Sequence, residues 1–270
     1  MNGHSTKPGK KRPATKVAPD APLPILFDDD RIVAVAKPAG LATIPGRAET
    51  DSVLERLARQ LKIPCSGTAD PRLRIVHRLD KETSGVLLMA KDIAAQRYLS
   101  EQFQNNLIQK EYLALVAGQP PAEQGEIDAA LAPHPTSRDR MAISKQGRPA
   151  RTLWRVERRM RPFTLLRVFP KTGKTHQIRV HLKSIGLPLA IDPLYNPPRP
   201  SSQGSEPGIY LSQFKQNYRP NAHGSERPLI CRLTLHAERL QFNHPDGREI
   251  LIECPPPKDF RATVMQLGKL

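Results

Sequence analysis

The sequence has few of the features that indicate a metal centre, a disulfide framework or a membrane anchor. Its 270 residues include three cysteines, and none of them belongs to a CxxC pair or has a histidine at ligand spacing. A structural zinc site and a disulfide framework are therefore not expected. No apolar run approaches the roughly 20 residues that span a bilayer, and the N-terminus lacks the apolar stretch of a signal peptide. These absences predict a soluble cytoplasmic protein with reduced thiols.

Acidic residues are scarce relative to basic ones. The chain has 42 Lys and Arg against 26 Asp and Glu, which gives a formal net charge of +16. Such a charge raises the local concentration of polyanions, so nucleic acid or a ribonucleoprotein is the natural partner. Composition alone leaves open a basic soluble protein with no such partner. The 38% of hydrophobic residues are enough to form a core.

The pattern of polar and apolar residues predicts a basic tail followed by one domain. Residues 1–22 are rich in Lys, Pro and Ala and are expected to be disordered, either adding non-specific RNA affinity or only solubility. From residue 23 to 270, strand-like runs mix with helical patterns without strict alternation. This order favours an α+β domain over a doubly wound parallel sheet. The strand-like runs are IVAVA at 32–36, GVLLMA at 85–90, YLALVAG at 112–118, TLLRVF at 164–169 and EILIE at 249–253.

Three helices and two excursions are expected around these strands. Residues 51–62 place leucines on one helical face after Asp51 or Ser52 as the N-cap, and a second helix follows Asp92 over about 92–105. A third is expected to open near Thr175 and to end at Gly186. Two segments are expected to form long loops beside a cleft, where they are reasonable clamps for an RNA stem. They are the basic residues 133–151 and the Pro-, Ser- and Gly-rich residues 196–208. The adjacent acids at 28–30 indicate a solvated turn rather than a metal site.

The most informative stretch is HRLDKETSG at residues 77–85. It places the carboxylate of Asp80 between Arg78 and Lys81 and leads directly into an apolar, strand-like run. A charged loop that feeds a core strand can hold a reactive side chain rigidly at the edge of a pocket. A surface turn with a solvated Asp–Arg pair is the alternative that this stretch leaves open on its own.

HRLDKETSG resembles the signature of the RluA-type RNA pseudouridine synthases, in which the aspartate is the catalytic residue. Four further stretches resemble the same family, in the same order along the chain. The similarity spans about residues 24–260, and an ordered set of motifs is much more specific than a single one. The four stretches are KPAGLATIPG at 37–46, KEYLALVAG at 110–118, KTGKTHQIRVHLKSIGLPLAIDPLY at 171–195 and RLTLHAERLQFNHPDG at 232–247.

The resemblance implies a large mixed or antiparallel sheet with a central cleft, and an enzyme that isomerises uridines of rRNA or tRNA stem-loops. Asp80 is then the nucleophile, and attack at sugar carbon 1′ and at ring carbon 6 both remain open. Arg179 is implied as its charge partner, because a nearby cation keeps a buried carboxylate ionised. Tyr112 falls at the family's active-site tyrosine, where it can stack on the flipped base and help to move the proton of carbon 5.

Four more residues are candidate contacts to substrate. Arg78 is implied to help flip the target nucleotide and to fill its place. Lys174, which stands where many relatives have arginine, keeps a charge for phosphate. His176 is expected to cap the helix or to face RNA, and Ile178 to form an apolar wall under the base.

Other chemistries find little support in the sequence. GKT at 173–175 lacks the upstream glycine of a phosphate-binding loop, and neither HExxH nor a dinucleotide-binding glycine fingerprint is present. We expect no organic cofactor, no metal, a monomer, and no S4-type RNA-binding module in so short a tail. A non-catalytic RNA-binding or ribosome-assembly factor on the same scaffold is the alternative. A carboxylate-dependent hydrolase is a weaker one, because no motif supplies its second acid.

Overall fold

The structure is a computed structural model that describes residues 21–46, 51–65, 72–197, 207–215, 218 and 226–270. The predicted tail at 1–22 lies almost wholly outside the described residues, as does most of the segment at 196–208. The strands of the main sheet are β1 (Ile25–Asp28), β2 (Ile32–Lys37), β3 (Arg74–Ile75), β4 (Ser84–Ala90), β5 (Gln109–Ala117), β6 (Gln124–Asp128), β9 (Arg151–Met160), β10 (Phe163–Pro170), β11 (Leu235–Asn243) and β12 (Glu249–Glu253).

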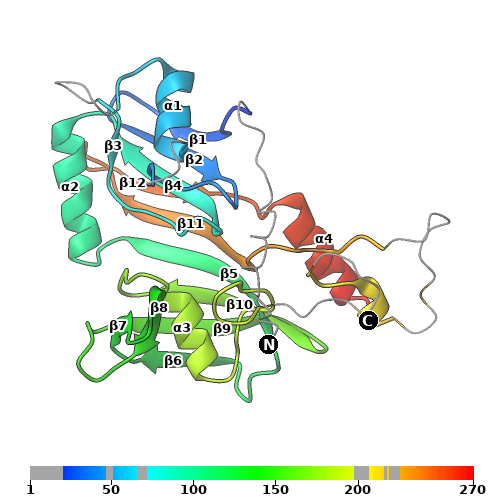
Figure 1. The fold of residues 1–270 in the computed structure, drawn as a ribbon. Helices are drawn as coiled ribbons and strands as arrows, with labels where there is room; N and C mark the ends of the chain where they lie inside the picture. Colours follow the sequence, from blue (N-terminus) through cyan, green and yellow to red (C-terminus); the bar gives the residue numbers. More distant parts are fainter. Residues whose placement is uncertain (1–20, 47–50, 66–71, 198–206, 216–217, 219–225) are drawn as a thin grey trace, which may run out of the picture.

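These strands form one large mixed sheet, in the order β1-β2-β4-β11-β5-β10-β9-β6 (Figure 1). The strands β12 and β3 pair with β11 and β4 beside this path. The pair β4–β11 is parallel and the other pairs are antiparallel. The predicted α+β class with a large mixed sheet is confirmed. All five strand-like runs of the sequence are strands, and each contains β-branched side chains, which favour strands.

In the described part of the chain, four α-helices cover the two faces of this sheet. Ser52 caps α1 by accepting the backbone N–H of Glu55, and Asp92 caps α2 by accepting that of Ala95, as the sequence predicted. The third helix begins two residues later than expected, and α4 was not predicted. Among the described residues no helix is long and apolar enough to cross a membrane. The helices are α1 (Val53–Leu61), α2 (Ile93–Gln104), α3 (Gln177–Ser184) and α4 (Lys258–Leu267), with a 3-10 turn at Leu211–Gln213.

Alternation along the strands assigns the helices to opposite faces. Val33 and Val35 of β2 pack with α1, whereas Ile32 and Ala34 pack with α2. On β5, the residues Ala114 and Val116 pack against α3, and Leu113 and Leu115 pack near α4. The half-buried Tyr112 contacts the clusters of both α1 and α3. The face that carries α1 and α3 therefore has Tyr112 where their two halves meet.

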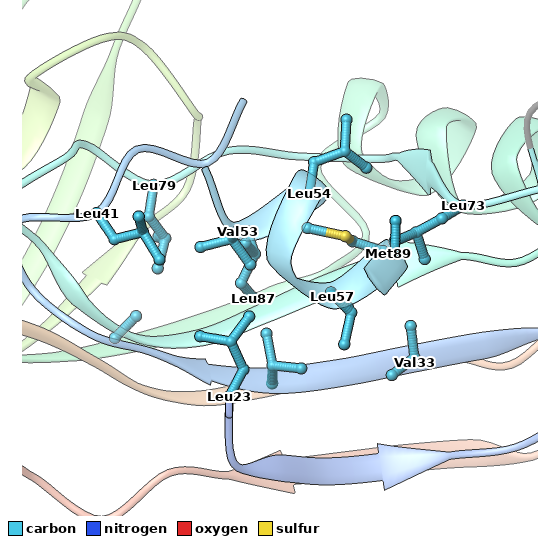
Figure 2. Packing of buried hydrophobic residues seen from close by; sticks show 13 residues of the cluster. Leu23, Val33, Leu41, Val53, Leu54, Leu57, Leu73, Leu79, Leu87 and Met89 are labelled. Atoms are coloured by element: carbon cyan, nitrogen blue, oxygen red, sulfur yellow. The ribbon is translucent and has the colours of Figure 1, made fainter. Parts of the chain in front are cut away.

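The cluster under α1 also anchors the segment that contains Asp80. Figure 2 shows Leu79 beside Leu41 at one end of this cluster, with Val53, Leu54 and Leu57 of α1 packed over the strands. Leu79 is 6% exposed. Burying a leucine side chain contributes roughly 1.5–3 kcal/mol, so the residue before Asp80 is held by the core.

The basic segment 133–151 differs from its prediction as a long loop. It contains a second, two-stranded sheet formed by β7 (Leu131–His134) and β8 (Ser137–Ile143), which stands apart from the main sheet. Leu131 and Met141 pack against Val180 of α3 and against Tyr195. The hairpin has little apolar alternation because it buries only these few side chains, and this explains why the sequence did not indicate strands.

Candidate active site

The residues on both sides of Asp80 are fixed by hydrogen bonds. The hydroxyl of Thr43 donates to the carbonyl of Leu79 over 3.0 Å and accepts its backbone N–H over 3.2 Å. The Lys37 ammonium donates to the carbonyl of Lys81 over 2.9 Å. The backbone of Asp80 is thus held by its neighbours, four residues before the buried strand β4 begins at Ser84.

Lys37 is a buried cation beneath this loop, 1% exposed. It donates to the carbonyls of Pro38, Leu41 and Lys81 at 2.7 to 2.9 Å. Burial lowers the pKa of Lys37 to about 7, against the opposing charges of Glu82 and Asp80. Because three carbonyls require three N–H donors, the charged form fits this cage better than the neutral amine.

The loop ends at a close approach between two strands. Gly85 of β4 lies opposite Ala237 of β11 and has a φ of +126°, which is costly for any residue with a Cβ. A Cβ at this position would lie 2.1 Å from the carbonyl oxygen of Ala237. Glycine here lets the parallel pair form directly below the Asp80 loop.

Asp80 and Arg179 are in direct contact, although they are 99 residues apart in sequence. The Nη1 of Arg179 donates to Oδ2 of Asp80 over 3.0 Å. Its other two nitrogens hold Asp192 in a bidentate pair, with Nε to Oδ2 at 2.8 Å and Nη2 to Oδ1 at 2.7 Å. The side chains of Arg179 and Asp192 are 4% and 1% exposed, and that of Asp80 is 21% exposed. Asp192 therefore fixes the guanidinium, and the guanidinium presents its free edge to Asp80.

The guanidinium of Arg179 remains positively charged in this setting. Burial alone would lower the pKa of Arg179, but the hydrogen bonds and charge of Asp192, together with the charge of Asp80, raise it above its ordinary value. Arg179 therefore remains a cation, which favours the ionised form of a carboxylate beside it. The arrangement leaves one carboxylate buried and fully paired and the other partly open to a cavity.

Asp80 opens onto two cavities, of about 620 Å³ and 490 Å³. The larger one falls within the roughly 300–1,000 Å³ of ordinary ligand sites and has room for a nucleotide. The two share Arg78, Leu79, Asp80, His176 and Arg179. Tyr112, Lys110, Lys174 and Ile178 line the larger one. All seven predicted site residues therefore border one cavity: Arg78, Asp80, Tyr112, Lys174, His176, Ile178 and Arg179.

Tyr112 is a neutral phenol in this setting. Burial and the charge of Asp80 raise its pKa above the ordinary value. A phenolate is therefore disfavoured, and the ring is better suited to stacking and to donating a hydrogen bond than to acting as a base at neutral pH.

Cations surround the mouth of the larger cavity. Arg78 is exposed and Lys174 is half-buried. Lys110 donates to the carbonyl of Thr172 over 3.1 Å, and burial, with the charges of Lys171 and Lys174, lowers its pKa to about 8. These side chains suit a polyanion that enters the cavity.

His176 lies where it was expected but makes contacts that the sequence did not indicate. It occupies the N-cap position of α3, and its side chain makes no capping hydrogen bond. Its Nε2 is 3.7 Å from Oδ2 of Asp80, and its Nδ1 is 2.9 Å from the hydroxyl of Tyr195. The chain before the helix is held instead by Gln177, whose side-chain oxygen Oε1 accepts the backbone N–H of Lys174 over 3.0 Å.

Asp192, Tyr195 and Lys110 were not predicted as site residues. Asp192 and Tyr195 belong to the DPLY motif, and an acid directly after the apolar LPLAI was the available signal. Lys110 lies two residues before Tyr112 on β5, so the two share a face of the sheet. Among the described residues no group of three or more His, Cys, Asp or Glu side chains is placed to hold a metal ion.

Buried histidines predict acid sensitivity of this fold. His77 accepts the backbone N–H of Leu88, and burial with the charge of Lys110 lowers its pKa to about 3. Burial likewise lowers the pKa of His236 to about 4. Since the unfolded chain takes up these protons near pH 6.5 and the folded protein does not, the free energy of unfolding should decrease as pH falls from about 6.5 towards 4, by up to about 1.4 kcal/mol per pH unit for each histidine.

Urea denaturation between pH 7 and pH 4.5 measures this dependence. The variant His236→Gln should have a shallower slope than the wild type over this range, because one titrating group is gone. An unchanged slope would show that His236 is not kept neutral in the folded protein.

Comparison with known proteins places this geometry in a wider context. The family described as RNA pseudouridylate synthase matches residues 31–184. The ribosomal large subunit pseudouridine synthase D of Nitrosomonas europaea is 39% identical over 92% of this chain. The protein of the same name from Xanthomonas campestris is 37% identical over 94% of this chain. This chain spans 66% and 72% of the length of these two relatives.

Solved structures show the same fold. The human RNA pseudouridylate synthase domain containing 4 superposes with a TM-score of 0.66 at 25% identity, over 90% of this chain and 92% of that one. The human RNA pseudouridylate synthase domain containing 1 has a TM-score of 0.65 at 23% identity, over 90% of this chain and 86% of that one. The likeness to the second of these shows the fold alone.

Proposed function

Because this chain belongs to the RNA pseudouridylate synthase family, we propose that it converts specific uridines of large-subunit ribosomal RNA into pseudouridine, with Asp80 as the nucleophile. Its class of activity is that of an RNA pseudouridine synthase, an isomerase that acts within one nucleotide. The support for a ribosomal substrate is that its relatives are named ribosomal large subunit pseudouridine synthases.

One observation carries the catalytic role of Asp80. The backbone on both sides of Asp80 is fixed by hydrogen bonds, and its carboxylate is paired to Arg179 at 3.0 Å and lines a cavity of about 620 Å³. A surface turn with a solvated ion pair would not be expected to have a buried arginine held in turn by a second carboxylate. A non-catalytic RNA-binding factor would have no need for a partly open carboxylate at the base of such a cavity.

The proposed reaction is balanced within the nucleotide. Asp80 bonds to carbon 1′ of the sugar or carbon 6 of the ring, and the bond between nitrogen 1 and carbon 1′ breaks. The uracil turns, carbon 5 bonds to carbon 1′, and the carboxylate leaves. The proton of carbon 5 is released, and nitrogen 1 gains a proton. The Arg179 guanidinium lies against the Asp80 carboxylate and balances its charge when the base excludes water, and Tyr112 stacks on the base.

The remaining predicted residues act on the RNA in this proposal. Arg78 is exposed at the edge of both cavities, where it can fill the space left by the extruded nucleotide. Lys174 approaches phosphate, and Ile178 forms part of the apolar wall. The net charge of +16 supports encounter with RNA. We propose that the enzyme acts as a monomer, because Asp80, Tyr112 and Arg179 come from one chain. We place it in the cytoplasm.

Tritium release from RNA that carries 5-tritiated uridine tests the activity. Transcripts of large-subunit ribosomal RNA, small-subunit ribosomal RNA and tRNA are compared at equal concentration with purified protein. Release from the large-subunit transcript in excess of the others supports the proposal. Release from tRNA alone would contradict the ribosomal substrate, and binding without release from any transcript would favour the non-catalytic alternative.

A further inference from the structure

His176 has an unusual backbone that places its ring between two partners. Its φ is +55°, in the left-handed region that residues other than glycine seldom adopt. Its side chain makes no capping hydrogen bond to α3. The ring instead lies with Nε2 at 3.7 Å from Asp80 and Nδ1 at 2.9 Å from the hydroxyl of Tyr195. Such outliers concentrate at functional sites, where the surrounding contacts maintain them.

The contacts of Tyr195 favour one tautomer of His176, the one with its proton on Nε2. The hydroxyl oxygen of Tyr195 accepts the backbone N–H of Met141 in β8 over 2.7 Å. Its single proton is then available for Nδ1 of His176, which acts as the acceptor. In this tautomer the N–H of His176 is at Nε2 and faces Asp80. Burial lowers the pKa of His176 more than the charge of Asp80 raises it, so the ring is neutral.

Tyr195 contacts both side chains that lie against the carboxylate of Asp80, which are Arg179 and His176. Its ring lies 5.1 Å from Cζ of Arg179, in the range of a cation–π contact. Its backbone N–H donates to Asp192 over 3.1 Å. The charged groups around His176 are accordingly Asp80, Arg179, Asp192 and, more distantly, Arg78. A displacement of Tyr195 would therefore change the positions of both Arg179 and His176 relative to the carboxylate of Asp80.

The other contacts of Tyr195 are to the β7–β8 hairpin. Leu131 and Met141 pack with Tyr195 and Val180 in one small cluster. Arg138 of the hairpin is exposed to solvent, as are Lys145 and Arg148 in the segment that directly follows β8. The hairpin stands outside the main sheet, and this small cluster and the bond from Met141 to Tyr195 join it to the site. RNA that binds these cations would press on the same contact.

We propose that Tyr195 and His176 are positioning residues that couple the seating of the β7–β8 hairpin to the direction in which the Nε2–H dipole of His176 faces the carboxylate of Asp80. RNA bound on the hairpin holds the N–H of Met141 against the hydroxyl of Tyr195. That hydroxyl keeps Nδ1 of His176 as an acceptor and Nε2–H directed towards Asp80. This inference rests on the proposed function for its RNA ligand, while the tautomer of His176 is a property of the free protein.

The variant Tyr195→Phe tests the coupling, because it keeps the ring against Arg179 and removes the hydroxyl. We expect kcat for tritium release to fall about tenfold and KM to stay within about twofold, since RNA contacts are unchanged. In ¹⁵N spectra of the imidazoles, His176 should lose its Nε2–H tautomer preference and titrate at higher pH, because a donor to the neutral ring is gone. Tyr210→Phe is the matched control, since it also removes a buried hydroxyl but lies outside this site.

A second variant keeps the proposal testable if Tyr195→Phe folds poorly. Arg138→Ala/Lys145→Ala/Arg148→Ala should leave the His176 spectrum of the free protein unchanged, and should remove the change that wild-type His176 shows on RNA binding. An unchanged kcat in Tyr195→Phe, or a lower kcat with an unchanged His176 spectrum, would overturn the coupling. Failure of the wild type to release tritium from any transcript would overturn the proposed function instead and would leave the tautomer measurement valid.

Discussion

Pseudouridine formation is expected to fall by on the order of a thousandfold or more when Asp80 is replaced by Asn. An asparagine amide has nearly the same shape but does not form and release the bond to the nucleotide that a carboxylate nucleophile makes. The fold should persist, because Arg179 remains paired with Asp192 through two hydrogen bonds. RNA affinity should stay close to the wild-type value, since the cations at the cavity mouth are unchanged.

Single-turnover tritium release and RNA binding by the same preparation separate the two effects. Asp30→Asn is a suitable control, because it makes the same chemical change at an exposed turn far from the cavity in sequence. Loss of RNA binding together with loss of product would indicate an electrostatic or structural role for Asp80. Turnover at the wild-type rate would exclude Asp80 as the nucleophile.

Replacement of Arg179 by Met is expected to lower the free energy of unfolding by about 3–5 kcal/mol, the usual cost of leaving a buried charge without its partner. Asp192 is 1% exposed and would lose both of its guanidinium hydrogen bonds. Asp80 is 21% exposed, so water can solvate it more readily. Most of the stability loss should therefore come from the unpaired charge of Asp192. Catalysis should be lost because Asp80 no longer has its charge partner.

Urea denaturation of a small set of variants resolves these contributions. Arg179→Met/Asp192→Asn should recover part of the lost stability, because it removes the unpaired charge, and should remain inactive. Arg56→Met is a matched control, since Arg56 is also 4% exposed but its partner Asp51 is 47% exposed and should cost less to leave alone. A double variant that is less stable than Arg179→Met would show that the pair with Asp192 does not maintain this site.

Features set by neighbouring residues could be predicted from the sequence. The N-caps at Ser52 and Asp92 are local, because a side chain bonds to a backbone N–H three residues ahead. The five apolar runs are strands for a similar reason, since their burial depends on composition over a few residues. By contrast, α4 begins after Pro257 without a side-chain cap and is stabilised by Phe260 and Leu267 packing on distant strands. Packing on distant strands leaves no pattern in the sequence of the helix itself that would predict it.

Some features of the candidate site could likewise be predicted from the sequence, and others could not. The sequence by itself determined the basic charge, the α+β class and, through its ordered motifs, the resemblance that identified Asp80, Tyr112 and Arg179 as a group. Only the tertiary structure decided that Asp192 fixes Arg179 and that Tyr195 joins His176 to the β7–β8 hairpin. Caps and strand patterns arise from interactions along a few residues, whereas these contacts depend on where the folded chain brings distant side chains and how it turns them.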